Sequence, residues 1–319
     1  MDCNLKELSN YWEFTSFELD KLHIPIQTAF QEYSYYLHSR EIDNYFLPDK
    51  LYNFCKCEFY VANINYNINV QKIAIIREEG SNGDKEMEAA FYYVGFEVYN
   101  FTTSQLNENP NLLDKVRGIA FVGGFSFSDV LGAAKGWYLS ITKNNKIYNA
   151  LLKFLENPNN FSLGICNGCQ LMIRTNFIDT NVKLNENNSK RFESRFSTIK
   201  INKNKSIFFK DMEDTIFGIW VAHREGRFSN TSRLPKNQIC LQYYHNNQVT
   251  NNYPHNPNGS EQGIAGICSN DGRHTILMPH PERCFLKWQL PYCNKYQNIQ
   301  TSPWIYMFKN SYEWCKNPK

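Results

Sequence analysis

The amino-acid sequence predicts an α/β fold in which helices flank a mostly parallel central sheet, with added antiparallel strands and a small N-terminal appendage. From residue 72 onward, short apolar runs typical of buried strands alternate with segments of helical spacing. This alternation favours a parallel sheet that helices cover on both faces. One apolar run, at residues 161–165, enters a turn of small residues that leads into a helix. After residue 195 the sequence becomes strand-rich, which predicts strands that extend or flank the sheet.

The N-terminal part is the least regular, and we predict a segment at residues 1–69 followed by a main domain at residues 70–319. Residues 19–38 have the spacing of a helix with one apolar face. The positions near that face are Leu22, Ile26, Phe30 and Tyr33. Residues 54–61 have the composition of a strand. We expect the segment to be a docking element that is stable mainly against the rest of the chain.

Within the main domain, the period and length of the apolar runs distinguish strands from helices. Helices are predicted at residues 86–94, at 148–155 and from Asn167 to about Arg174. Buried strands are predicted at residues 72–76, 96–101, 118–122 and 161–165, and further strands at 197–201, 206–209, 219–223, 239–244, 263–268 and 274–278. Functional groups in open α/β sheets gather beyond the carboxyl ends of the strands, so we expect a site after residues 122 and 165.

A cysteine occupies the turn at the end of residues 161–165. The pattern Gly164-x-Cys166-x-Gly168 is the cysteine form of a nucleophile elbow, in which small residues flank the nucleophile because the chain doubles back there. The turn presents the thiol at a helix N-terminus, where the partial positive charge favours the reactive thiolate. We therefore interpret Cys166 as a candidate nucleophile.

Other interpretations of this cysteine remain open. A lone cysteine in an apolar run is usually a small core residue. Cys166 and Cys169 have the spacing of a redox pair or of half a zinc site. Zinc requires two further ligands, and the spacing of Cys55 and Cys57 fits the usual separation poorly. We predict no metal site.

A candidate base lies near the C-terminus. His280 and Glu282 are two residues apart on a segment that Pro279 and Pro281 hold extended. Side chains two apart on an extended backbone point to the same side, which is the arrangement that a base and its orienting carboxylate need. An isolated His-x-Glu is more often an incidental surface loop, but the cysteine turn in the same chain favours the catalytic interpretation.

Further motifs occur in a fixed order between about residues 72 and 288. They are Ile75-Ile76-Arg77-Glu78-Glu79-Gly80, Gly123-Gly124-Phe125-Ser126, Cys166-Asn167-Gly168-Cys169-Gln170, Arg191-Phe192-Glu193-Ser194-Arg195, Asn256-Pro257-Asn258-Gly259-Ser260 and Met278-Pro279-His280-Pro281-Glu282-Arg283. This set resembles the class I (triad) glutamine amidotransferases, whose fold is flavodoxin-like. More narrowly, it is similar to the glutaminase domains of phosphoribosylformylglycinamidine synthases.

The resemblance implies roles for particular residues in the hydrolysis of glutamine to glutamate and ammonia. Cys166 would be the nucleophile, His280 the base and Glu282 the carboxylate that orients it. The backbone N–H groups of Gly124 and Asn167 would form the oxyanion hole. The residues expected to bind glutamine are Gly123, Gln170, Arg191, His223 and Glu225. Two of these have simpler interpretations, since Arg191 could pair with Glu193 and His223 could be structural.

The resemblance extends more weakly upstream, where residues 12–22 look like the tail of the synthetase portion of those enzymes. It implies that this chain is a piece of a larger protein or one product of a split gene. Its partner would be a synthetase domain or subunit, which uses the released ammonia to convert formylglycinamide ribonucleotide in purine synthesis. ATP and Mg²⁺ are expected only in that synthetase portion, and no cofactor is expected in this chain. The sequence contains no Gly-x-x-x-x-Gly-Lys-Ser/Thr phosphate loop.

Three positions depart from the family pattern. Ser128 and Ala134 stand where the family often has glycine, and Ser128 is costly if that position needs a positive φ. Arg224 replaces a glycine and would place a bulky cation beside the pocket. These departures leave open an alternative, a catalytically impaired glutaminase-like subunit with a structural or regulatory role, although retention of the complete triad argues against it. Another triad hydrolase or amidotransferase with the same elbow is also open.

Composition argues against nucleic-acid and membrane partners and indicates the cellular location. The net charge of +3, with acids and bases interspersed, predicts no nucleic-acid or membrane partner. The ten cysteines are scattered through a long α/β pattern, which favours reduced thiols and a cytoplasmic location. The N-terminus lacks the pattern of a signal peptide. Asparagine-rich stretches at residues 144–145, 185–188 and 246–247 are interpreted as solvated loops that carry no chemistry.

Overall fold

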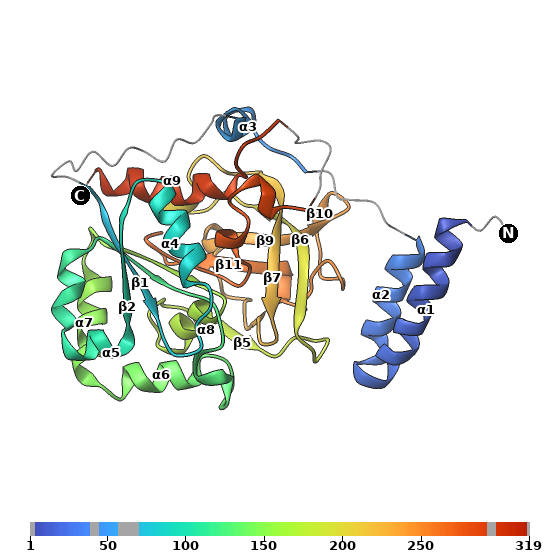
Figure 1. Ribbon diagram of the computed structural model, residues 1–319, viewed down its shortest axis with the longest axis horizontal. Helices are drawn as coiled ribbons and strands as arrows, with labels where there is room; N and C mark the ends of the chain where they lie inside the picture. The colour runs from blue at the N-terminus through green and yellow to red at the C-terminus, as the bar shows by residue number, and fades with distance from the viewer. Residues whose placement is uncertain (1–3, 39–44, 57–69, 292–297, 318–319) are drawn as a thin grey trace.

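The computed structural model describes residues 4–38, 45–56, 70–291 and 298–317, and it confirms the α/β architecture (Figure 1). The strands are β1 (Lys72–Arg77), β2 (Glu97–Thr102), β3 (Gly118–Phe121), β4 (Phe161–Ile165), β5 (Lys183–Asn185), β6 (Glu193–Ile201), β7 (Ile216–His223), β8 (Arg227–Ser229), β9 (Ile239–His245), β10 (Gln248–Val249), β11 (Ile264–Cys268) and β12 (His274–Leu277). The α-helices are α1 (Leu5–His23), α2 (Ile26–His38), α3 (Asp49–Lys56), α4 (Asp84–Tyr93), α5 (Thr103–Glu108), α6 (Lys135–Thr142), α7 (Asn145–Glu156), α8 (Asn167–Arg174) and α9 (Trp304–Cys315).

Ten strands form one sheet with a parallel half and an antiparallel half. The order along the sheet is β2-β1-β3-β4-β12-β11-β9-β6-β7, and β10 pairs with β9. The strands from β2 to β12 in this order run parallel, whereas the pairs from β12 to β7 are antiparallel. β5 and β8 form a separate two-stranded ribbon. The predicted parallel sheet with added antiparallel strands is therefore confirmed.

Helices cover both faces of the parallel half. Figure 1 shows α4 and α9 on one side of the sheet and α6, α7 and α8 on the other. Phe91 of α4 packs edge-on against Phe308 of α9, with ring centroids 4.9 Å apart. On the opposite face, Phe121 of β3 meets Trp137 of α6 at 5.9 Å. All four residues belong to one buried core, which anchors the carboxyl ends of β3 and β4 side by side.

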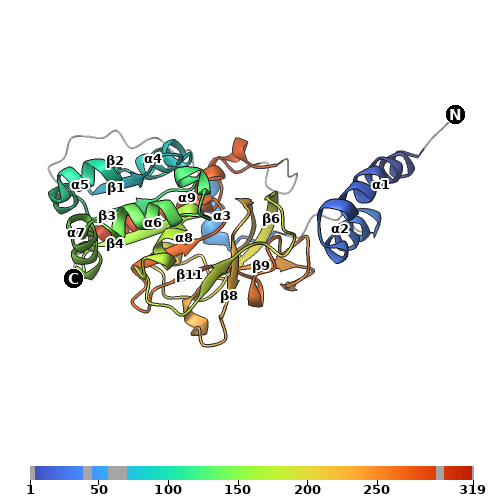
Figure 2. The ribbon, with the colours of Figure 1, turned by 90° about the horizontal axis from the view of Figure 1, so that it is seen from below.

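The first two helices form a hairpin at one end of the molecule, beside the antiparallel half of the sheet (Figures 1 and 2). The single helix predicted at residues 19–38 is wrong, because Ile24 adopts an extended conformation and Pro25 separates α1 from α2. The hairpin has a small core of its own in which Phe17 stacks on Tyr33, with ring centroids 4.3 Å apart. Leu22, Ile26 and Phe30, predicted on one apolar face, are more than half exposed.

The N-terminal segment is divided between two environments. Residues 45–56 belong to the main core, where Leu51 and Cys55 are fully buried and Phe46 forms a β-bridge with Ile216. The strand predicted at residues 54–61 is wrong at its start, which is the end of α3, and its remainder lies outside the described residues. The predicted boundary between residues 69 and 70 also falls at an undescribed stretch and stays a prediction.

The other differences from prediction have local causes. Residues 207–209 form a 3-10 turn instead of a strand, because the Ser206 hydroxyl accepts a hydrogen bond from the Phe208 N–H at 3.2 Å and caps the turn. The short helices α5 and α6 and the C-terminal helix α9 were not predicted. Trp137, in the first turn of α6, is fully buried and its indole N–H donates to Thr103 Oγ1 at 2.9 Å, so α6 depends on tertiary packing.

The close approach of α8 to β3 generates a stability prediction. A Cβ at Gly168 would collide with the carbonyl group of Phe121, lying 2.5 Å from its carbon. We expect Gly168→Ala to lower the free energy of unfolding by roughly 2–3 kcal/mol, because neither backbone can move aside. Denaturant unfolding measures the change.

Gly83→Ala is the matched control. A Cβ at this position would be 3.5 Å from the nearest atoms, and the Gly83 φ of −105° suits alanine. Equal stability of the two variants would contradict the tight contact between α8 and β3.

Candidate active site

Cys166 lies at the tip of a strained turn between β4 and α8. Its φ of 52° and ψ of −104° are unusual for a residue with a side chain. Its N–H donates to the Leu277 carbonyl at 2.8 Å, and its carbonyl accepts from the Gln170 N–H at 3.0 Å. Gly164 leaves the space that the turn needs, since a Cβ there would lie 2.9 Å from the Gly168 carbonyl oxygen. The predicted elbow, including both of its glycines, is confirmed.

His280 reaches the cysteine from the far end of the chain. Its N–H donates to the Trp220 carbonyl at 2.8 Å, which fixes the segment against β7. Its Nδ1 is 2.6 Å from Glu282 Oε1, and both side chains are buried. The side chains of His280 and Glu282 therefore converge as the sequence predicted.

Gly123 brings the imidazole and the cysteine together. A Cβ at this position would lie 2.8 Å from His280 Cε1 and 3.4 Å from Cys166 Cβ. The missing side chain therefore creates the space in which the two functional groups meet. The buried Nε2 of His280 has no hydrogen-bond partner in the described part of the chain, which leaves it available to the sulfur or to a substrate.

The electrostatics of this pair favour a protonated imidazole. Burial alone would lower the pKa of His280, but the Glu282 carboxylate and the Cys166 side chain more than offset it and raise the pKa to about 9. The imidazolium is thus held between the Glu282 carboxylate and the Cys166 side chain in a site from which water is largely excluded. Cys166 Sγ also lies 3.4 Å from the Ala222 carbonyl oxygen, so the end of β7 forms one wall around the sulfur.

Two backbone N–H groups belong to residues next to Gly123 and Cys166 in the chain, those of Gly124 and Asn167. Gly124 has a φ of 134°, and a Cβ there would lie 2.6 Å from both Asn82 N and Ser81 Cα. Within the described ranges, neither the Gly124 N–H nor the Asn167 N–H donates to a backbone carbonyl. Asn167 is the first residue of α8, where N–H groups lack partners within the helix and attract negative charge. Both N–H groups are therefore without a backbone acceptor in the described residues, and their role in an oxyanion hole stays a prediction.

The residues predicted to bind glutamine do not all face the sulfur. Gln170 is buried and bonded within the protein, through its Nε2 to the Glu225 carbonyl and its Oε1 to Asn167 Nδ2 at 3.0 Å. The Glu225 carboxylate accepts from the Ala133 N–H at 3.3 Å. Gln170 and Glu225 therefore brace the turn that follows β7.

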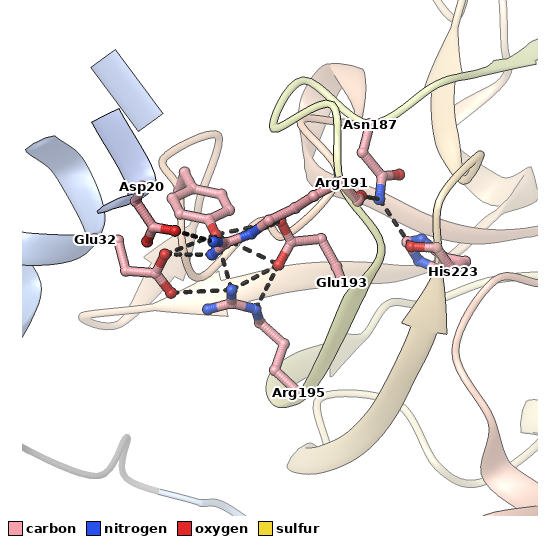
Figure 3. A network of polar contacts seen from close by, with 8 residues as sticks. Asp20, Glu32, Asn187, Arg191, Glu193, Arg195 and His223 are labelled. Carbon is pink, nitrogen blue, oxygen red and sulfur yellow. Dashed lines mark hydrogen bonds and ion pairs between the residues drawn. The ribbon is translucent and has the colours of Figure 1, made fainter. Parts of the chain in front are cut away.

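His223 and Arg191 occupy different environments. His223 is buried beside the triad, and burial together with the charge of His280 lowers its pKa to about 3, which keeps it neutral. The guanidinium of Arg191 points away from His223 toward the helical hairpin (Figure 3). There it contacts Asp20 at 3.2 Å and Glu193 at 3.3 Å. The structure therefore places Arg191 in an ion cluster, including the pair with Glu193 that the sequence left open, and not beside the sulfur.

Sequence reasoning missed Asn187 and interpreted its asparagine-rich stretch as a solvated loop. That interpretation is wrong for Asn187, which is fully buried. Its Nδ2 donates to the carbonyls of Arg191, at 3.1 Å, and His223, at 2.8 Å, and its Oδ1 accepts from the Gly226 N–H at 3.2 Å. Nothing in the asparagine-rich composition distinguishes Asn187 from its neighbours, because its partners at His223 and Gly226 are distant in sequence.

The departures from the family pattern have visible consequences. Phe127, Ser128, Asp129 and Ala134 all adopt positive φ values between 50° and 58°. Each non-glycine residue in this conformation costs on the order of 1 kcal/mol, so the concern about Ser128 is confirmed. Arg224 is exposed and pairs with Glu186 at 3.3 Å, so its charge is directed to the surface.

No group of three or more potential metal ligands occurs within the described residues. The described cysteines, Cys166 and Cys169 included, are free thiols. Of the helices described, none combines the length and the apolar character needed to cross a lipid bilayer.

Comparison with known proteins places this geometry in a family. Residues 70–315 match the CobB/CobQ-like glutamine amidotransferase domain, and the chain belongs to that family. Its relatives include phosphoribosylformylglycinamidine synthases: a probable one from Arabidopsis thaliana is 41% identical over 97% of this chain and 23% of its own length. Those of Drosophila melanogaster and Homo sapiens are 40% and 37% identical, over 99% and 97% of this chain. The chain spans about a quarter of the length of these relatives.

A solved structure shares the fold. The structure of PurLQS from Thermotoga maritima has a TM-score of 0.60 and covers 77% of this chain and 100% of its own, at 23% identity. This likeness shows the class I glutamine amidotransferase fold that the sequence predicted.

The charge on His280 generates a pH prediction. Because the folded pKa of about 9 is above the ordinary 6.5, the stabilisation by the imidazolium is fully present below pH 6.5 and is lost as the pH rises through 9. We expect NMR titration of the His280 ring to give a midpoint near 9. Cys166→Ala should lower that midpoint, because it removes a side chain that raises the pKa of His280.

His274 is the internal control for this titration. Burial and the charge of Arg273 lower its pKa to about 4, and it should titrate alike in both proteins. A His280 midpoint at or below the ordinary value would contradict the proposed pairing with Cys166 and Glu282.

Proposed function

We propose that Cys166, His280 and Glu282 hydrolyse the side-chain amide of glutamine. The observation that supports this most directly is the convergence of the three side chains around Gly123, where a Cβ would touch both the imidazole and the cysteine. Family membership supports the substrate, since the matching domain is a glutamine amidotransferase domain. Glutamine enters as the donor and leaves as glutamate and ammonia.

The first half of the reaction forms a thioester. The Cys166 thiolate attacks the amide carbon, a C–S bond forms, and the carbonyl electron pair moves to oxygen. The N–H groups of Gly124 and Asn167 stabilise this oxyanion, and one such donor typically contributes about 3 kcal/mol to the transition state. When the C–N bond breaks, the His280 imidazolium gives its proton to the leaving nitrogen, and ammonia departs. Glu282 holds the imidazole in the orientation that this transfer needs.

The second half releases glutamate. Neutral His280 takes a proton from water, and the resulting hydroxide attacks the thioester carbon. The C–S bond breaks, the sulfur leaves as thiolate, and the imidazolium is restored, so protons and electrons balance over the cycle. Gly123 gives room for substrate beside the pair, while His223, Gln170 and Glu225 form and brace the surrounding wall.

We further propose that the ammonia serves the conversion of formylglycinamide ribonucleotide to formylglycinamidine ribonucleotide. The names and lengths of the relatives support this, because the matched piece is about a quarter of each phosphoribosylformylglycinamidine synthase. A synthetase portion, as a domain or a separate subunit, would use ATP and Mg²⁺ for that step. A shielded path would keep ammonia from being protonated at neutral pH. The cytoplasmic location stays a proposal that rests on the free thiols.

The alternative is a catalytically impaired subunit with a structural or regulatory role. The strained backbone at Ser128 and Ala134 is the observation that favours it. The intact geometry of the triad favours the enzyme.

Labelling of Cys166 distinguishes the two. We expect a glutamine-mimicking chloroketone to modify Cys166 stoichiometrically. Excess glutamine should protect Cys166, because glutamine and the reagent would compete for the same pocket beside the thiol. Cys166→Ala should lower glutamine hydrolysis by at least about a thousandfold, as loss of a nucleophile does.

Cys169→Ala is the matched control, since this neighbouring thiol is fully buried and burial raises its pKa well above the ordinary value. Cys169→Ala should keep both labelling and activity. Absence of protected labelling, with the synthetase portion also present, would support the impaired subunit.

A further inference from the structure

The helical hairpin is joined to the glutaminase domain by a cluster of charged side chains (Figure 3). Arg191 contacts Asp20 on α1 and Glu32 on α2, and Arg195 contacts Glu32 at 3.1 Å. Both guanidinium groups also hold Glu193, which is almost fully buried, and donate to the Tyr253 hydroxyl at 2.7 and 2.8 Å. The hairpin thus supplies two of the carboxylates that this cluster contains.

The charge balance makes the contact with the hairpin energetically significant. With the hairpin in place, two guanidinium groups face the carboxylates of Asp20, Glu32 and Glu193. If the hairpin were removed, Glu193 would be the one carboxylate of this cluster that still pairs with Arg191 and Arg195. Removal of one partner from a largely buried ion pair is costly, because the remaining charge loses its compensation. The positions of Arg191 and Arg195 therefore depend on the hairpin.

Asn187 connects Arg191 to the turn near the triad. One amide group joins the backbone of Arg191 to the backbone of His223 and Gly226. A second connection runs through the sheet, where Glu193 of β6 pairs directly with His223 of β7. The cluster and the turn after β7 are thus linked both by a buried side chain and by the strand ladder.

The turn at residues 222–226 forms the wall of the proposed glutamine site. Ala222 places its carbonyl oxygen 3.4 Å from Cys166 Sγ. The Glu225 carbonyl accepts from Gln170 Nε2, on the helix that begins beside the nucleophile. A shift of this turn would therefore move atoms that border the thiol.

We propose that Glu32 and Asn187 are positioning residues through which the hairpin sets the geometry of the glutamine site. Glu32 holds Arg191 from outside, and Asn187 transmits the position of Arg191 to the turn that borders Cys166. This inference rests on the proposed glutaminase function for its kinetic consequence. Its structural consequence is that the conformation of residues 222–226 depends on the hairpin, and this can be measured without enzymatic turnover.

The full chain carrying Glu32→Gln tests the proposal. We expect kcat/KM for glutamine hydrolysis to fall by about fivefold, mainly through KM, a size typical of coupling between sites. Hydrogen exchange at the Gly226 amide, which donates to Asn187, should become faster by a similar factor. Glu7→Gln is the matched control, because it removes an exposed acid from α1 of the same hairpin. It should change neither quantity.

A double-variant experiment separates positioning from general destabilisation. If Glu32 acts through Asn187, Glu32→Gln should have no further effect on kcat/KM or on Gly226 exchange in an Asn187→Ala background. Thermal unfolding shows whether each variant folds. If the variant with the buried substitution Asn187→Ala does not fold, kcat/KM and Gly226 exchange in Glu32→Gln alone test the proposal. Wild-type values of kcat/KM and Gly226 exchange in Glu32→Gln would overturn the proposal. An inactive wild type would count against the glutaminase function alone, because Gly226 exchange would still decide the inference.

Discussion

The meeting of His280 with Cys166 is the interaction on which the site depends. The two residues are more than a hundred positions apart, and three features of the fold bring them together. Parallel pairing of β4 with β12 places the ends of both strands at one edge of the sheet. The His280 N–H is bonded to the Trp220 carbonyl of β7, and Gly123 leaves the space between imidazole and cysteine. Burial would remove the charge of His280, but the Glu282 carboxylate and the cysteine retain it.

The same arrangement explains why backbone strain is concentrated around the site. Cys166 itself has a positive φ, and so do Gly124 and the residues from Phe127 to Asp129. The surrounding core fixes these conformations, since β3, β4 and α8 are packed so closely that no side chain fits at Gly164 or Gly168. Packing of the core therefore stabilises a strained turn at Cys166 that an isolated segment of the chain would not adopt.

Much of the fold and the triad could be predicted because their signals are local. The glycines around Cys166 and the prolines around His280 each dictate a backbone shape, and the alternating apolar runs dictate the parallel sheet. The break at Pro25 was missed because the apolar spacing continues across it, and α6 was missed because tertiary burial of Trp137 defines it. Asn187 and the orientation of Arg191 depend on partners distant in sequence, for which a single chain gives no signal.

The hairpin shows how a segment outside the matched domain can bear on the site. Its apolar core is small, and charged groups make the contact with the domain that Figure 3 shows. Such a contact can adjust a site without contributing to its chemistry.

Detection of the covalent intermediate tests the central claim most directly. Acid quenching during turnover with glutamine, followed by peptide mass spectrometry, should find a γ-glutamyl group on the peptide that carries Cys166. Release of glutamate without that adduct, or an adduct on another cysteine, would contradict the assignment of Cys166 as the nucleophile.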